Sequence, residues 1–143
     1  MITTVPFKIL SIGEEGYHLM IKLYINRKVA NVIIDTGASA TVFDKTRILK
    51  YVTDSSMVVE HDNLSSGLGT NTMKSQFTTL KKIKIGELRI EDYKAVLLDL
   101  SHVNKSYHQV GLTPIDGVLG SDILLKHKAV IDYAKQNLRL KKR

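Results

Sequence analysis

The chain has 143 residues, a length that suits one domain with its own hydrophobic core and is short for two. Hydrophobic residues make up 43% and charged residues 24%, which excludes a disordered or fibrous chain, and the absence of cysteine excludes disulfides, thiolate nucleophiles and cysteine-based metal sites. The net charge of +7 could indicate a nucleic-acid partner, but its lysines are not interleaved with aromatic residues. We therefore expect one globular domain over residues 1–143 with a solvated basic face.

The dominant pattern along the chain is an alternation of apolar and polar residues with a period of two, which is typical of strands. Pro6 should lie at the start of a strand or at a sheet edge. Asn26 and Arg27 should form a tight connection between two strands, the second of which runs directly into Asp35. In chain order, we expect strands at residues 5–12, 17–25, 28–34, 40–43, 76–85, 88–100, 129–133 and 137–141.

Only two stretches indicate helical structure. Residues 44–50 could form one short turn, and residues 121–128 predict a helix. At its start Ser121 or Asp122 can accept hydrogen bonds from free main-chain N–H groups, and the lysines near its end suit the helix dipole. Many short strands with close turns predict an all-β sandwich or barrel. The polar, glycine-containing residues 60–74 indicate a long loop or hairpin.

The most informative segment surrounds Asp35, which follows Val32, Ile33 and Ile34 at the end of a strand that heads into the core. A carboxylate there is costly unless it is hydrogen-bonded, paired or protonated. Gly37 lacks a side chain, so main-chain N–H groups can approach the carboxylate closely. Taken alone, this pattern also fits an aspartate that caps its own turn between two strands.

A second segment, about eighty residues downstream, combines apolar residues with a glycine and a polar helix start. Residues 33–39 and 118–122 together resemble two motifs of the retropepsin-like aspartic proteases, the single-domain relatives of pepsin. The resemblance covers most of residues 17–141. It implies a closed or partly open all-β barrel with one short helix in its C-terminal half and a β-hairpin flap. Residues 1–16 would be an added N-terminal strand.

The resemblance also implies roles for particular residues. Asp35 would be the catalytic carboxylate, and the loop that supports it would comprise Thr36, Gly37, Ala38 and Ser39. The second segment would pack beside that loop through Val118, Leu119, Gly120 and Asp122. The flap would span about residues 60–75 and contact the substrate through Ser66, Gly67, Leu68 and Gly69, although an ordinary loop would have the same composition.

The chain departs from the retroviral members at Ser39 and Ser121 and from the pepsin-type enzymes at Ala38. Retroviral members usually carry an acidic residue at the position of Ser39 and an arginine at the position of Ser121, and these form an ion pair. Since both partners are absent, hydroxyl and main-chain hydrogen bonds must brace the loop instead. Pepsin-type enzymes place a hydroxyl residue at the position of Ala38, and Ala38 cannot donate to the carboxylate.

The number of catalytic loops determines the expected assembly. Two-domain pepsins contain two Asp-Thr/Ser-Gly loops, whereas this chain has one, because Asp116-Gly117 lacks the intervening hydroxyl residue. A symmetric homodimer would supply the second Asp35, with an interface formed by the chain ends and Thr36. The two carboxylates would share one proton and activate a water molecule against an extended peptide. This chemistry needs neither a metal nor an organic cofactor.

Two alternatives remain at this stage. The chain could be a catalytically weak or inactive retropepsin-like module that binds peptides or dimerises, or an unrelated barrel with a fortuitous turn. No histidine pair has metal-ligand spacing, and no Gly-x-Ser-x-Gly elbow of a serine hydrolase is present. The sequence shows neither a signal-peptide pattern nor an apolar run near the ~20 residues that a membrane helix needs. We expect a cytoplasmic protein that binds neither nucleic acid nor membranes.

Overall fold

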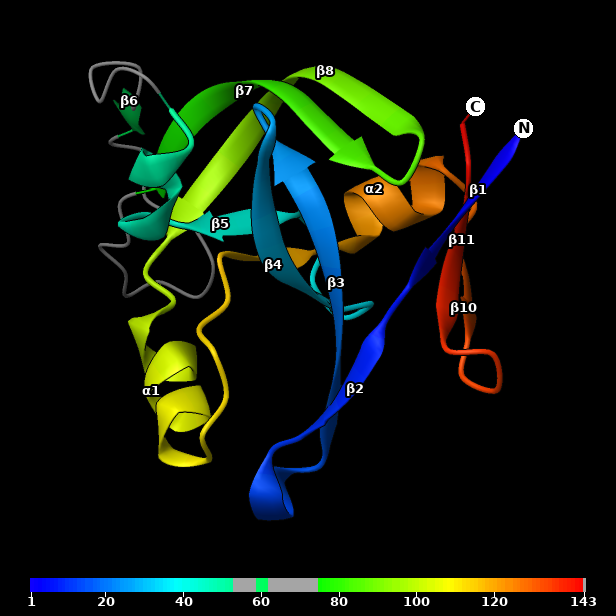
Figure 1. Ribbon diagram of the computed structural model, residues 1–143. Coiled ribbons are helices and arrows are strands. Elements are labelled where there is room, and N and C mark those ends of the chain that lie inside the picture. Colours follow the sequence, from blue (N-terminus) through cyan, green and yellow to red (C-terminus); the bar gives the residue numbers. More distant parts are fainter. Residues whose placement is uncertain (53–58, 62–74, 143) are drawn as a thin grey trace.

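The computed structural model describes residues 1–52, 59–61 and 75–142 and consists mainly of strands (Figure 1). The strands are β1 (Ile2–Pro6), β2 (Lys8–Ser11), β3 (Tyr17–Ile25), β4 (Lys28–Ile34), β5 (Val42–Asp44), β6 (Val59–His61), β7 (Ser75–Ile85), β8 (Leu88–Leu98), β9 (Gly117–Leu119), β10 (Val130–Asp132) and β11 (Asn137–Lys141). The helices are α1 (Ser101–Gln109) and α2 (Ser121–Lys126), with 3₁₀ turns at Gly13–Glu15 and Arg47–Lys50. Within these ranges, no helix is both long and apolar enough to cross a membrane.

Six strands close into a barrel in the order β3-β4-β9-β5-β8-β7. The barrel closes where β7 returns to β3, with Tyr24 opposite Lys84 and Ile25 opposite Ile83. Most neighbours are antiparallel, but β4 pairs with β9 in parallel and β5 pairs with β8 in parallel. β2 extends the sheet beyond β3, and β6 extends it beyond β7. The expected all-β barrel is confirmed.

The hairpin between β3 and β4 has the tight connection that the sequence predicts. Asn26 and Arg27 both have positive φ values, 48° and 73°. This backbone geometry suits a two-residue hairpin, because its twist matches the right-handed twist of the flanking strands. The side chain of Asn26 donates to the carbonyl of Tyr51 at 2.8 Å and accepts from the Lys82 N–H at 3.2 Å. The turn is thereby attached to two other parts of the barrel.

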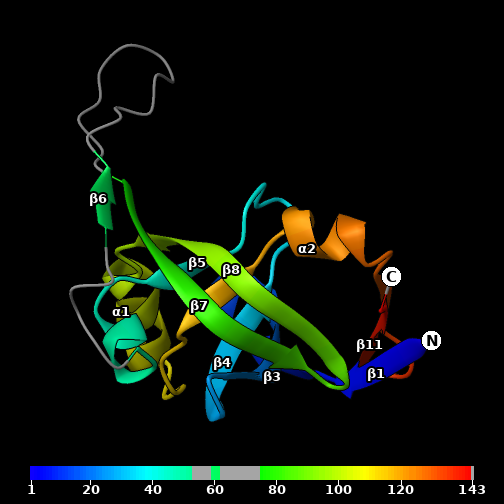
Figure 2. The ribbon, with the colours of Figure 1, turned by 90° about the horizontal axis from the view of Figure 1, so that it is seen from above.

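A second, three-stranded sheet has the order β1-β11-β10 and brings the two chain ends side by side (Figures 1 and 2). The prediction of one strand over residues 5–12 is wrong in this region. The chain instead forms β1 and β2, which belong to different sheets. The break falls at Phe7, whose N–H donates to the carbonyl of Gln136 and whose side chain is buried. Pro6 ends β1, since it has no N–H to continue the ladder.

Helix α1 was not predicted, so the expectation of a single helix is also wrong. Its sequence is mostly polar, and Tyr107 is its buried residue. Tertiary hydrogen bonds attach the helix to the segment before β9: Asn104 donates to the carbonyl of Ile115 and accepts from its N–H. The carboxylate of Asp99 accepts from the Ser101 N–H at the helix start, and hydrogen bonds from the Ser101 hydroxyl and N–H lower the pKa of Asp99. In Figures 1 and 2, α1 and the three-stranded sheet lie at opposite sides of the barrel.

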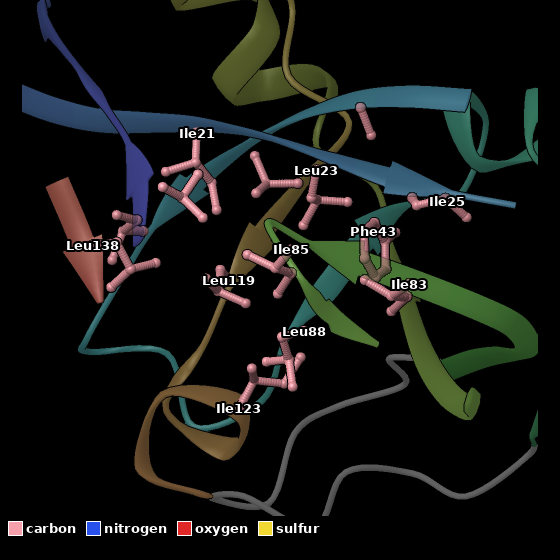
Figure 3. Packing of buried hydrophobic residues seen from close by; sticks show 14 of the residues in the cluster. Ile21, Leu23, Ile25, Phe43, Ile83, Ile85, Leu88, Leu119, Ile123 and Leu138 are labelled. Carbon is pink, nitrogen blue, oxygen red and sulfur yellow. The ribbon is translucent and has the colours of Figure 1, made fainter. Parts of the chain in front are cut away.

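The main core fills the barrel and continues to the three-stranded sheet (Figure 3). Branched aliphatic side chains from β3, β7 and β9 belong to the same core as Phe43, as expected for a chain without tryptophan. A smaller cluster lies between the barrel and α1 and includes Ile33, Tyr107 and Ile115. Leu138, in the middle strand of the three-stranded sheet, has no exposed surface and belongs to the main core. The two sheets therefore share one core.

Because the two sheets share one core, a leucine-to-alanine substitution should lower the free energy of unfolding by different amounts at two positions. Leu138→Ala should lower the free energy of unfolding by about 2–5 kcal/mol, because it leaves a cavity where the sheets meet. Leu125→Ala on α2 should change it by less than about 0.5 kcal/mol, since Leu125 is 80% exposed. Urea unfolding at one fixed protein concentration measures both. Equal costs for the two variants would contradict the shared core.

Candidate active site

The parallel pairing of β4 with β9 brings the two sequence motifs together. Ile33 lies opposite Val118, and Ile34 lies opposite Leu119. The ladder continues one residue beyond β4, since the Asp35 N–H donates to the carbonyl of Leu119 at 2.9 Å. Asp35 therefore begins its loop at the point where the second segment turns into α2.

The loop after β4 folds around the carboxylate of Asp35. Its Oδ1 atom accepts from the Gly37 N–H at 2.9 Å, and the Ala38 N–H donates to the carbonyl of Asp35 at 3.2 Å. A side chain at position 37 would begin with a Cβ atom 3.3 Å from Asp35 Oδ1. The close approach that the sequence predicts for Gly37 is present. Asp35, Thr36 and Gly37 are exposed in the single chain.

The start of α2 holds the other end of this loop. The Ser121 N–H donates to the carbonyl of Ala38 at 2.7 Å, and Ser121 Oγ donates to the carbonyl of Ser39 at 3.5 Å. A Cβ atom on Gly120 would lie 2.5 Å from the main-chain carbon and oxygen of Ala40, so a side chain there would push the loop away. Main-chain and hydroxyl groups thus brace the loop, as the absence of the ion pair required.

Thr41, whose side chain is buried, is the centre of a hydrogen-bond network behind the loop. Its N–H and its Oγ1 both donate to Oδ1 of Asp122, at 2.9 and 2.7 Å, and its Oγ1 accepts from the Gly120 N–H at 2.9 Å. The hydroxyl of Tyr93 donates to the other carboxylate oxygen of Asp122. Burial and this bond raise the pKa of Tyr93 above its usual range. Asp122 therefore links the loop, α2 and β8.

Sequence reasoning did not identify Thr41 or Tyr93 as supporting residues. Thr41 follows the loop that the sequence singles out, yet a threonine before a strand is common and carries no special signal. Tyr93 lies on β8, far from both motifs in the sequence, and is brought to Asp122 by the closure of the barrel.

Two further buried aspartates stabilise the structure beneath the site. Asp116 is 3% exposed, and its carboxylate accepts from Arg47 Nε and from the Asn31 N–H, both at 2.9 Å. Asp44 accepts from the main-chain N–H groups of Arg47 and Leu100, both at 2.8 Å. Such pairing is what a buried carboxylate requires. Both residues hold segments of the barrel together.

A pocket of about 330 Å³ opens beside Asp35. Its walls come from the start of β3, the end of β4, α1, β9 and β10, and they are mainly aliphatic. The imidazole Nδ1 of His18, at the pocket, lies 2.6 Å from the hydroxyl of Tyr107 on α1. Burial raises the pKa of Tyr107 to about 12. An exposed carboxylate next to an apolar pocket suits a peptide substrate whose side chain enters the pocket.

The predicted flap tip, formed by Ser66, Gly67, Leu68 and Gly69, lies outside the described residues. The strands that flank this segment, β6 and β7, pair antiparallel from Val59 opposite Phe77 to His61 opposite Ser75. In the described ranges, no three His, Asp or Glu side chains gather closely enough to hold a metal ion.

The fold and the motif pair define a retropepsin-like aspartic protease domain. Residues 21–123 match the family model described as aspartyl protease, and the chain belongs to this family. The fold is similar to a retropepsin-like aspartic protease from Rickettsia conorii, at 24% identity and a TM-score of 0.57 over 98% of this chain and 94% of that chain. It is also similar to the retroviral protease-like domain of Ddi1 from Leishmania major, at 15% identity and a TM-score of 0.55 over 86% and 87%. A comparison with curated protein sequences gives no significant match.

The network around Thr41 predicts a specific loss of stability. Thr41→Val should lower the free energy of unfolding by about 1–3 kcal/mol, because it removes a donor to Asp122 and the acceptor of the buried Gly120 N–H. Thr79→Val, the same change at an exposed position of β7, should cost less than about 0.5 kcal/mol. Chemical denaturation measures both values. A Thr41→Val protein as stable as the wild type would show that the network contributes nothing.

The raised pKa of Tyr93 predicts how stability changes in alkaline solution. Above pH ~10 the unfolded chain releases the tyrosine proton while the folded chain keeps it, so the free energy of unfolding falls as pH rises. Tyr93→Phe removes this contribution. The variant should be less stable than the wild type near neutral pH, because it lacks the bond to Asp122, but should lose less stability above pH ~10. Parallel stability curves from pH 8 to 11 would contradict this assignment.

Proposed function

We propose that this protein is an aspartic endopeptidase that acts as a homodimer, with Asp35 as its catalytic residue. The observation that supports this most strongly is the exposed carboxylate of Asp35, which is held by the Gly37 N–H beside an apolar pocket. Membership of the aspartyl protease family supports the same reaction class. Asp44 and Asp116 differ from Asp35, because their carboxylates are buried and bind neighbouring segments of the fold.

The exposure of Asp35 also supports the homodimer. Peptide hydrolysis by this route needs one carboxylate that accepts a proton and one that donates a proton. One chain contributes a single loop of this kind, so a second copy related by a two-fold axis would supply the other carboxylate. The facing carboxylates would be shielded from bulk water by the second copy and by the substrate.

In the mechanism that we propose, the two Asp35 carboxylates share one proton, since two like charges at close range do not both form easily. The ionised carboxylate takes a proton from a bound water molecule as the water oxygen attacks the scissile carbonyl carbon. The protonated carboxylate donates its proton to the carbonyl oxygen. The first Asp35 carboxyl then gives the proton that it took from water to the amide nitrogen, and the carbon–nitrogen bond breaks. As the carboxylic acid product forms, a hydroxyl of the tetrahedral intermediate returns a proton to the second Asp35, which restores the shared proton.

The supporting residues have distinct roles in this proposal. Gly37 provides the N–H that orients the carboxylate, and Thr36 would reach the loop of the second copy. Ala38 and Ser39 provide the carbonyl groups by which Ser121 holds the loop. The substrate would be a peptide in extended form, bound through main-chain hydrogen bonds and through side chains that enter the pocket. The reaction as proposed uses no cofactor.

The activity can be tested by comparing two aspartate-to-asparagine variants. Asp35→Asn should reduce cleavage of an unfolded protein or a peptide library by at least about 10²–10⁴-fold, because an amide cannot exchange the proton. Its stability should not fall, since the amide is nearly isosteric and removes repulsion between the carboxylates. Asp99→Asn is the control, because Asp99 is exposed and an amide oxygen can also accept the hydrogen bond from the Ser101 N–H. This variant should cleave the substrate at the wild-type rate. A statine-type transition-state mimic should abolish cleavage by the wild type.

Mixing the subunits separates the homodimer from the reaction class. Equal amounts of wild type and Asp35→Asn, allowed to exchange subunits, should show about half the activity of the wild-type portion alone, because mixed dimers are inactive. Unchanged activity would indicate that one chain is sufficient. Binding of the mimic without any cleavage would contradict the enzymatic proposal and favour a peptide-binding module.

A further inference from the structure

Lys84 on β7 lines three pockets that lie outside the candidate active site. Their volumes are about 400, 450 and 480 Å³, and none of their lining residues belongs to the pocket of Asp35. Among the described residues that line them, Glu87 alone carries a carboxylate, and it already pairs with a lysine of its own chain at 3.7 Å. Besides Lys84, the cations of this basic surface are Lys8, Lys22, Arg27, Lys82, Arg89 and Lys142.

The centre of the basic surface is a row of three side chains across three strands. Tyr24 on β3 lies opposite Lys84, and Lys84 lies opposite Arg89 on β8. Opposite residues of antiparallel strands present their side chains on the same face, and two like charges in such a pair repel each other. In the described part of the chain, neither Lys84 nor Arg89 forms an ion pair that would offset this repulsion. An anion bound between them would offset it.

The pocket of about 450 Å³ adds an apolar component to this charge. Its lining combines Lys8, Lys22 and Lys84 with apolar side chains from β1 and β3. Tyr24, which belongs to this lining, is 48% exposed. A ligand that carries anionic groups alone would leave the apolar part of the pocket in contact with water. The pocket therefore suits a ligand with both carboxylates and apolar groups.

The walls of this pocket are held in place by the turn between β7 and β8, which lies against β1 (Figure 2). The Glu87 N–H donates to Oγ1 of Thr3 at 2.9 Å, and Thr3 is buried. A Cβ atom on Gly86, whose φ is +60°, would lie 2.4 Å from the same oxygen. The close contact keeps β1 and β7 at a fixed separation. A preformed pocket loses little conformational entropy when a ligand binds.

We propose that the basic surface binds an acidic peptide segment that also carries aliphatic side chains. Its carboxylates pair with Lys84 and Arg89, and an aliphatic side chain enters the pocket beside Tyr24. Lys82 and Lys84 are two residues apart on one strand, about 6.5–7 Å. Carboxylates at alternate positions of an extended peptide have the same spacing, so such a peptide matches these lysines one to one. The binding does not depend on peptide cleavage at Asp35.

A nucleic acid fits this surface less well. Its phosphates would meet the cations, but single-stranded bases bind mainly by stacking on exposed aromatic rings. Among the described residues that line the three pockets, Tyr24 is the one exposed aromatic residue. A sugar–phosphate backbone also offers no aliphatic group for the apolar lining. A lipid surface would need apolar side chains that protrude, whereas the apolar groups here line a hollow.

Fluorescence anisotropy tests the proposal with a short labelled peptide in which glutamate alternates with leucine. The double variant Lys84→Gln, Arg89→Gln should weaken binding by about tenfold or more, because it removes two charged partners. The control variant Lys105→Gln, Lys135→Gln loses the same charge at exposed positions that line none of the three pockets. It should change the affinity by less than about twofold. Equal losses in the two double variants would overturn the proposal.

Both double variants should remain folded, as circular dichroism would show. Loss of Lys84 and Arg89 should not lower the free energy of unfolding, because the substitution removes repulsion between like charges. A weaker affinity in a fully folded variant therefore reports on binding.

The composition of the probe tests the apolar pocket and the class of partner. A peptide with serine in place of leucine should bind about tenfold more weakly, since it buries less apolar surface. Equal affinity for the two peptides would overturn the role of the pocket. Tighter binding of a single-stranded RNA of equal charge, or of phosphatidylserine vesicles, with the same loss in the Lys84→Gln, Arg89→Gln variant, would overturn the choice of a peptide as partner.

The outcomes also separate the basic surface from the proposed function. Asp35→Asn should bind the glutamate–leucine peptide as the wild type does, and a statine-type mimic should not displace the peptide. Displacement by the mimic would place the peptide at Asp35 and overturn the proposal. If the peptide binds as expected but the wild type cleaves nothing, the basic surface stands and the proposed function is wrong. If the wild type cleaves substrates but does not bind the peptide, the proposed function stands and the basic surface is wrong.

Discussion

The parallel pairing of β4 with β9 is the constraint on which the candidate site depends. It places the end of one motif against the end of the other. The Asp35 N–H donates to the carbonyl of Leu119, so the loop of Asp35 begins beside the start of α2. Two glycines allow β5 and the loop before it to pack against β9 and the residue that follows it. A Cβ atom on Gly117 would lie 2.6 Å from the ring of Phe43 and from the carbonyl of Val42, and one on Gly120 would meet Ala40. Strand β5 and the loop before it can pass close to β9 because these two side chains are missing.

Much of the fold and the centre of the site could be predicted from the sequence. Strands β3 and β4 and their hairpin follow from local alternation and from Asn26-Arg27, and these features need no distant partner. Asp35 and Gly37 lie within three residues of each other, and Gly120 belongs to a motif of adjacent residues. Features that depend only on neighbouring residues can be recognised in the sequence.

What could not be predicted depends on contacts between distant segments. Helix α1 has a polar sequence and is held by the bonds of Asn104 to Ile115 and by burial of Tyr107 against the barrel. The break at Phe7 arises because the chain passes from one sheet to another there, where its N–H meets Gln136. Tyr93 reaches Asp122 only through closure of the barrel. None of these contacts is signalled by neighbouring residues.

The bracing of the loop by neutral donors has a consequence for the environments in which the site keeps its shape. Ion pairs at a surface weaken as dissolved salt screens their attraction, with a screening distance of only about 3 Å at 1 M salt. The bonds from Ser121 to Ala38 and Ser39, and from Thr41 and Tyr93 to Asp122, join no opposite charges that ions could screen. The loop that carries Asp35 is therefore held in the same way in dilute and in concentrated electrolyte, a tolerance that a bracing salt bridge would not provide.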